Sequence, residues 1–143
     1  MSRRPDQPPQ ATELLADAAV LEALDQAWTD SLVDDPLRRH EEGGWIYMDV
    51  TTGDISTRRA SVGHQAAIDL SNPPIESGAI VVGKFHTHPN PSSEGWNAGP
   101  SPSDLLIDER HGVPDLIRAD DGIHVSGPEC RRGGLQGGPG YPL

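Results

Sequence analysis

The feature that most constrains this chain is one apolar run, Ala79–His88 (AIVVGKFHTH), which ends in two histidines. A short run rich in branched and aromatic residues is typical of a buried strand, because such side chains pack well on a pleated surface. Pro73 and Pro74 precede the run, and Pro89 follows it directly. The sequence therefore predicts a buried strand that leads into a cluster of polar side chains.

Two hairpins are also predicted, each from two short strand-like segments that are separated by turn-forming residues. Trp45–Val50 and Ile55–Ala60 flank the turn at 51–54, and Leu116–Ala119 and Ile123–Ser126 flank the turn at 120–122. Together with the buried strand, these segments are enough for one β-sheet.

Helices are expected before and after these strands. From Thr12 to Val33, apolar residues recur every three or four positions, at Leu14, Ala18, Leu21, Leu24, Trp28 and Leu32. This spacing predicts an amphipathic helix whose apolar stripe must cover a sheet, and Pro36 prevents its continuation. A second helix is predicted over Ser103–His111 from its capping residues, and a short helical turn over Gln65–Leu70.

The length of 143 residues fits one domain, and 16 Gly and 14 Pro indicate many loops. We therefore expect a single α/β (α+β) domain at 11–127, with a mixed β-sheet flanked by helices. Residues 1–10 are Pro-rich and predicted to be disordered, and residues 128–143 are predicted to form a flexible Gly/Pro-rich tail.

The formal net charge of −11 opposes binding to nucleic acid or to an anionic membrane surface. No apolar run approaches the roughly 20 residues of a membrane helix, and residues 1–10 lack an apolar secretory segment. Cys130 is the only cysteine, which excludes an internal disulfide and a cysteine-based zinc knuckle. The expectation is a cytoplasmic protein, and the sequence does not indicate its oligomeric state.

Three side chains have the pattern of a metal site. His86 and His88 are two positions apart on the predicted strand, so both imidazoles project from one face and can reach one ion. Asp104, near the start of the following helix, can supply a third ligand. Three protein ligands with an open fourth position are typical of catalytic Zn²⁺. The competing interpretation is a polar strand end beside a helix whose N-terminus Asp104 favours.

Three motifs occur in order: Glu41-Glu42-Gly43-Gly44-Trp45-Ile46, His86-Thr87-His88-Pro89 and Ser101-Pro102-Ser103-Asp104. This series resembles the signature of the JAB/JAMM (MPN, Mov34-like) zinc metallopeptidases in a compact bacterial form, over roughly residues 14–127. The resemblance implies a cytidine-deaminase-like sheet with zinc on His86, His88 and Asp104. It also implies a proton carrier at Glu41, with Glu42 in reserve, and a hydroxyl at Ser101 that stabilises the oxyanion.

The chain departs from the family in the loop between the second and third motifs, which is longer than usual. We expect residues 90–99 to lie over or beside the cleft as a mobile lid, with Trp96 either contacting substrate or pinning the loop. The remaining histidines have no partner at ligand spacing and are interpreted as surface or loop residues: His40, His64, His111 and His124.

The function that the resemblance implies is hydrolysis of a peptide or isopeptide bond in a protein or peptide substrate. A ubiquitin-like protein or a precursor protein is the expected class. Arg131-Arg132-Gly133-Gly134 resembles the tails that such enzymes cut, but the favoured interpretation of this segment is a flexible Gly-rich end. Two alternatives are a catalytically inactive MPN-type binding module and a processing domain of a bacterial toxin or effector system. A nucleobase deaminase is excluded because its zinc site needs more than one cysteine.

Overall fold

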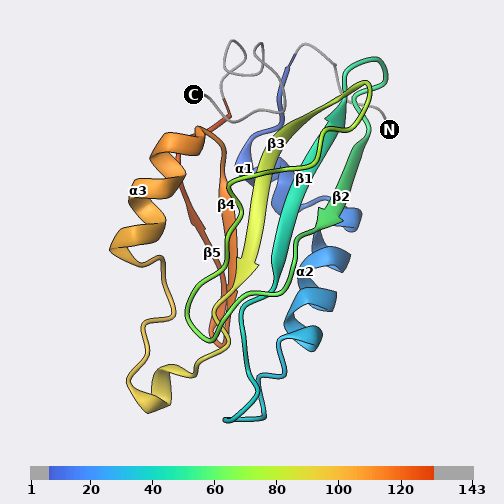
Figure 1. Cartoon of the computed structure of the whole chain (residues 1–143). Coiled ribbons are helices and arrows are strands. Elements are labelled where there is room, and N and C mark those ends of the chain that lie inside the picture. Colours follow the sequence, from blue (N-terminus) through green and yellow to red (C-terminus); the bar gives the residue numbers. More distant parts are fainter. Residues whose placement is uncertain (1–6, 131–143) are drawn as a thin grey trace.

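The computed structural model of this protein describes residues 7–130, which form a five-stranded sheet with helices against it (Figure 1). The strand order is β2-β1-β3-β4-β5. The strands are β1 (Gly43–Asp49), β2 (Ile55–Arg59), β3 (Ala79–Thr87), β4 (Asp115–Ala119) and β5 (Gly122–Ser126). The expectation of one α/β domain with a mixed sheet flanked by helices is confirmed.

The sheet is mixed because its centre joins two kinds of pairing. β1 is antiparallel to both β2 and β3, and β4 is antiparallel to β5, so both predicted hairpins and the buried strand are confirmed. β3 and β4 are parallel, and the chain crosses between them through η1 (Ser92–Glu94) and α3 (Pro102–His111). This crossover brings α3 beside the C-terminal end of β3.

One face of the sheet is covered by α1 (Ala11–Leu15) and α2 (Ala18–Asp30), which lie behind it in Figure 1. Leu14, Val20 and Leu24 are fully or almost fully buried there against β1, β3 and β4. The prediction of a single helix over 12–33 is wrong, because the helix is interrupted between Leu15 and Ala18. The Asp17 carboxylate accepts from the N–H groups of Ala19 and Val20 and so starts a new helix.

The other face is covered by the connection 60–78, which crosses in front of β3 in Figure 1. The helical turn expected over 65–70 is wrong, since this segment has no helix. Its backbone is instead engaged by the sheet: the Trp45 indole N–H donates to the Leu70 carbonyl at 3.0 Å, and the Tyr47 hydroxyl donates to the Pro74 carbonyl at 2.6 Å. These long-range hydrogen bonds outweigh a weak local helical preference.

A register shift between β1 and β3 sets the face on which β3 presents its polar side chains. Ile46 pairs with Gly83 and Tyr47 pairs with Val81, which leaves Val82 as the extra residue of a bulge. Val82 packs in the core beneath the helices, and a Cβ at Gly83 would meet Leu14 on that same side. Val82 and Gly83, two successive residues, thus face the helices. From Lys84 onward, every second residue of β3 faces the opposite side of the sheet.

The two ends of the described chain pack against each other and against the core. Pro9 is buried, and the Ala11 N–H donates to the Glu129 carboxylate at 2.8 Å. Cys130 packs against the core beneath the helices, and burial raises the pKa of its thiol to about 12. These contacts involve residues on both sides of the expected domain bounds of 11 and 127, and most of the expected N-terminal segment and tail, residues 1–6 and 131–143, lies outside the described residues. Within 7–130, no helix has the length and apolar character to span a membrane.

Candidate metal centre

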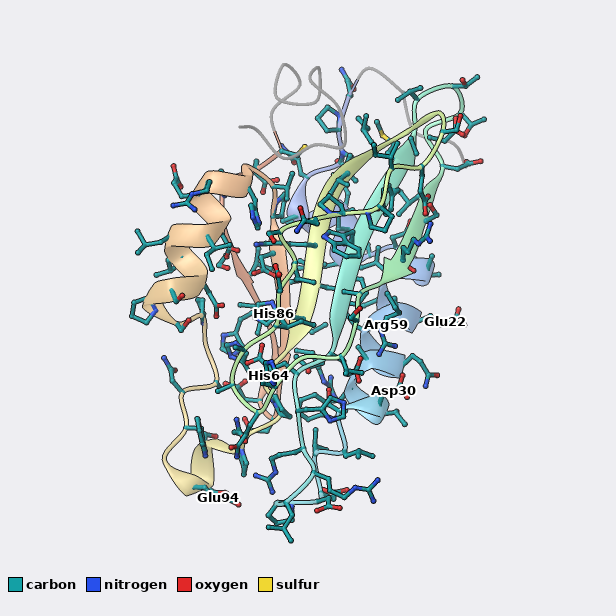
Figure 2. The ribbon with its side chains drawn as sticks, viewed as in Figure 1. Glu22, Asp30, Arg59, His64, His86 and Glu94 are labelled. Atoms are coloured by element: carbon teal, nitrogen blue, oxygen red, sulfur yellow. The ribbon has the colours of Figure 1, made fainter. Side chains whose placement is uncertain are left out.

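All five predicted site residues line one cavity of about 430 Å³, where β3 ends. The cavity lies between residues 66–71 of the connection and the inner side of α3. Glu41, His86, His88 and Asp104 all line it, and so does Ser101. Figure 2 shows His86 at the centre of the molecule, behind the connection, with Arg59 and Asp30 away from it beside α2.

The three expected metal ligands approach one another closely. The Nε2 atoms of His86 and His88 are 3.2 Å apart, and Asp104 oxygens lie 3.2 Å from His88 Nε2 and 3.7 Å from His86 Nε2. Zinc-to-ligand bonds of about 2.0–2.1 Å in a tetrahedron place two ligand atoms about 3.3 Å apart. The observed separations are close to that edge length, so the donor set fits one tetrahedral ion.

Hydrogen bonds fix which nitrogen of each imidazole faces the others. His86 Nδ1 lies 3.1 Å from the Asp115 carboxylate, and His88 Nδ1 lies 3.1 Å from the Ala98 carbonyl. Both partners can only accept, so both Nδ1 atoms must donate. Each neutral imidazole therefore directs a lone pair from Nε2 toward the other ring and toward Asp104.

When both rings are neutral, His86 Nε2, His88 Nε2 and the Asp104 carboxylate are converging acceptors, and such an arrangement is repulsive unless a proton or a metal ion lies among them. In the absence of a metal the cation is a proton. Burial disfavours a charged His86, but the carboxylates of Asp115 and Asp104 outweigh it, and the pKa of His86 is raised well above 6.5. Burial likewise opposes ionisation of Asp104, yet hydrogen bonds from the two imidazoles hold its pKa well below 3.8.

Asp104 owes its position to the first turn of α3. The Ser101 hydroxyl accepts from the Asp104 N–H at 3.0 Å, and the Asp104 carboxylate accepts from the Ser101 N–H at 2.9 Å. This reciprocal capping, with Pro102 at the first helical position, starts the helix one residue earlier than expected. Because the Ser101 oxygen accepts from the backbone, its own proton can be donated into the cavity.

Glu41 lies just before β1 on the cavity side of the sheet, on the same face as Gly43. A ligand atom of Glu41 lies within 4.8 Å of those of His86 and His88. Gly43 pairs with His86, and a Cβ there would lie 2.3 Å from the Phe85 carbonyl oxygen, so this close approach requires glycine. Burial raises the pKa of Glu41 to about 7, which is the range of an efficient general base at neutral pH.

Glu42 points to the opposite side of the sheet, toward α2. Its carboxylate is 2.7 Å from Arg59 and 2.6 Å from His40, and Arg59 also pairs with Asp30 at 3.0 Å. Strand alternation separates the two glutamates, so the structure brings Glu41 into the cavity and leaves Glu42 in an ion-pair network. His40, interpreted from the sequence as a surface or loop residue with no partner at ligand spacing, lies in a loop and is a member of that network.

The long loop is held at several points by polar contacts. The Ser92 N–H and hydroxyl both donate to Asp120, the Asn90 amide donates to the Gln65 carbonyl at 2.8 Å, and Arg39 pairs with Glu94 at 3.3 Å. Trp96 lines the cavity and is 41% exposed. The indole is thus available to a molecule in the cavity.

Beneath the cavity lies a buried group of charged residues that the sequence interpretation missed. Lys84 Nζ is 2.8 Å from Asp108 of α3 and 2.7 Å from His111 Nδ1, so the expectation of a surface His111 is wrong. Burial, together with the negative charge of the neighbouring Asp115, raises the pKa of Asp108 to about 6. One signal was visible in the sequence, namely a lysine inside an otherwise apolar strand.

Comparison with known proteins adds no relative: no family model, no curated protein and no solved structure matches this chain. The chemistry of the site is therefore inferred from its donor atoms, their spacing and their burial.

Proposed function

We propose that this protein is a zinc-dependent metallopeptidase of the JAB/JAMM type that hydrolyses a peptide or isopeptide bond. The observation that carries the proposal is the close convergence of His86 Nε2, His88 Nε2 and the Asp104 carboxylate, which lie 3.2 to 3.7 Å from one another. A buried carboxylate with a pKa of about 7, that of Glu41, stands beside this set. A ligand set with an adjacent proton carrier is what metal-assisted hydrolysis requires.

When bound, zinc supplies a Lewis acid that polarises the scissile carbonyl and lowers the pKa of water to about 7. His86, His88 and Asp104 hold the ion. Glu41 takes the proton of the attacking water and later delivers it to the leaving amine. The Ser101 hydroxyl donates to the developing oxyanion, and losing a donor in this role typically lowers the rate about a hundred- to a thousand-fold.

The shape of the cavity favours a polypeptide as substrate. One wall is the non-helical segment 66–71, and the other is the face of α3 that carries Asp104 and Ile107. An extended chain fits such a groove, with its scissile carbonyl at the histidines. The proposed family follows from the order of helix, hairpin, histidine-bearing strand and ligand-bearing helix. A ubiquitin-like or precursor protein is the proposed substrate class.

The same geometry allows a second role for Glu41, because its carboxylate is close enough to the histidines to be a ligand itself. A base and a ligand respond differently to Glu41→Gln. If Glu41 is only the base, Glu41→Gln still binds zinc but no longer hydrolyses substrate. If Glu41 is also a ligand, Glu41→Gln loses both zinc binding and hydrolysis. Two histidines with one carboxylate also suit Fe²⁺, so the metals compared must include it.

The test is hydrolysis of a proteome-derived peptide library by the zinc-loaded protein, with Glu41→Gln as the matched inactive control. The proposal predicts new peptide termini that depend on both zinc and Glu41. If the protein binds zinc tightly but cleaves neither the library nor protein conjugates, the enzyme proposal is wrong and the catalytically inactive binding module is the better interpretation. If only Fe²⁺ binds, the hydrolase proposal is wrong.

A further inference from the structure

Asp115 is the most deeply buried carboxylate that touches a proposed ligand. It is the first residue of β4, it pairs with Lys84 across the parallel strands, and its side chain is 1% exposed. Its Oδ1 atom lies 3.1 Å from His86 Nδ1. A carboxylate accepts and does not donate when it is ionised, so this contact requires a proton on Nδ1 and leaves the Nε2 lone pair facing His88 and Asp104.

The two histidines are oriented by different parts of the fold. His88 receives its orientation from the Ala98 carbonyl, which belongs to the long loop. His86 receives its orientation from Asp115, which is held in the sheet next to β3. The contact of His86 with Asp115 is the more rigid of the two, because β4 is paired with a neighbouring strand on each side.

Further buried groups lie beside the Asp115 side chain. Lys84 and Asp108 of α3 are its charged neighbours, and Asp108 is in turn paired with Lys84 and accepts from the Ser126 hydroxyl. Burying charge in this way is not an efficient means of stabilising a domain, since apolar residues of similar volume often serve as well or better. The burial of these charges is explained if the Asp115 carboxylate orients the His86 imidazole that it contacts.

We propose that Asp115 is a positioning residue of the metal centre, which fixes the tautomer and the ring orientation of His86 so that Nε2 faces the ion. The inference rests on the proposed function, because it assigns Asp115 a role only if His86 is a ligand. Residues in this position around protein-bound metals typically contribute about 10- to 100-fold to metal affinity.

The test is the zinc dissociation constant of the full chain, measured by competition with a chromophoric chelator. Asp115→Asn keeps the volume and an acceptor but removes the charge, and Asp115→Ala removes the contact. Asp121→Asn is the matched control, since Asp121 makes the same kind of contact with His124, at 2.8 Å, on the exposed edge of the sheet. Circular dichroism and thermal unfolding check that each variant is folded.

We expect zinc to bind about 10- to 100-fold more weakly to Asp115→Ala and measurably more weakly to Asp115→Asn, and unchanged for the control. Nitrogen-15 NMR of the zinc-loaded protein should find His86 bound through Nε2 and protonated on Nδ1, with the Nδ1–H signal lost or broadened in Asp115→Ala. If Asp115→Ala fails to fold, Asp115→Asn carries the test.

Equal zinc affinity in folded Asp115 variants and in wild type overturns this inference and leaves the proposed function standing. Absence of zinc binding by wild type overturns the proposed function, and the positioning role with it. A destabilised variant that nevertheless binds zinc with wild-type affinity also overturns the inference, because Asp115 is then structural only.

Discussion

Replacing Glu41 by glutamine should stabilise the metal-free protein at the same time as it abolishes hydrolysis. Burial raises the pKa of this carboxyl from 4.5 to about 7, so ionising it in the folded state is unfavourable. Stability that is complete below pH 4.5 is therefore lost as the pH rises through 7, and the loss approaches about 3 kcal/mol. Glutamine has a similar size and no charge to bury, so the variant avoids this loss.

The size of the effect depends on pH in a way that identifies its origin. The same two pKa values give Glu41→Gln an advantage of about 1 kcal/mol at pH 5.5 and about 3 kcal/mol at pH 8. Urea denaturation in the presence of a chelator, followed by tryptophan fluorescence, measures both values.

The matched control is Glu42→Gln, which changes the neighbouring glutamate on the opposite side of the sheet. Glu42 pairs with Arg59 and His40, so its neutralisation should destabilise the protein rather than stabilise it. A Glu41→Gln variant that is no more stable than wild type at pH 8, or equally more stable at both pH values, would refute the account of Glu41. An active Glu41→Gln enzyme would show that another group carries the proton.

Further predictions concern other parts of the site. Lys84→Met leaves Asp108 buried without its cation and should lower the unfolding free energy by about 3–5 kcal/mol in urea, and a cost below about 1 kcal/mol would contradict this. Trp96→Ala should leave the unfolding free energy within about 0.5 kcal/mol and raise KM, since the indole is exposed in the cavity; unchanged peptide kinetics would exclude a substrate contact. Hydrogen exchange across residues 90–99 should slow when a substrate-like peptide binds, and equal protection with and without it would contradict a lid.

Much of the fold follows from local patterns in the sequence. Turn residues at 51–54 and 120–122 predict the two hairpins, and the run 79–88 predicts β3. The long first helix could not be divided correctly by periodicity, because its apolar spacing continues through the break. The break occurs where the Asp17 carboxylate caps the start of the second helix. The segment 65–70 was mispredicted because the sheet, through Trp45 and its neighbours, determines its conformation.

The candidate ligands were visible because His86 and His88 are two positions apart and Asp104 lies at the start of the next predicted helix, but the residues that support them were not. Glu41 and Glu42 cannot be distinguished by burial, since β1 is buried on both faces and shows no alternation of apolar and polar residues. Only the position of the strand in the sheet assigns them to opposite sides. The contacts of Asp115 with His86 and of Lys84 with Asp108 join residues far apart in the sequence, so no local pattern predicts them.

The most direct test of the central claim is a zinc titration of chelator-stripped protein, with wild type beside a His86→Ala/His88→Ala double variant. If His86, His88 and Asp104 together hold an ion, each wild-type chain should bind one zinc tightly. The same three ligands predict no tight site in the double variant and weaker binding as the pH falls, because the imidazoles take up protons, and His86, whose pKa is raised, does so already above pH 6.5. A wild-type protein that binds no zinc, or a double variant that binds it as tightly as wild type, would contradict the claim.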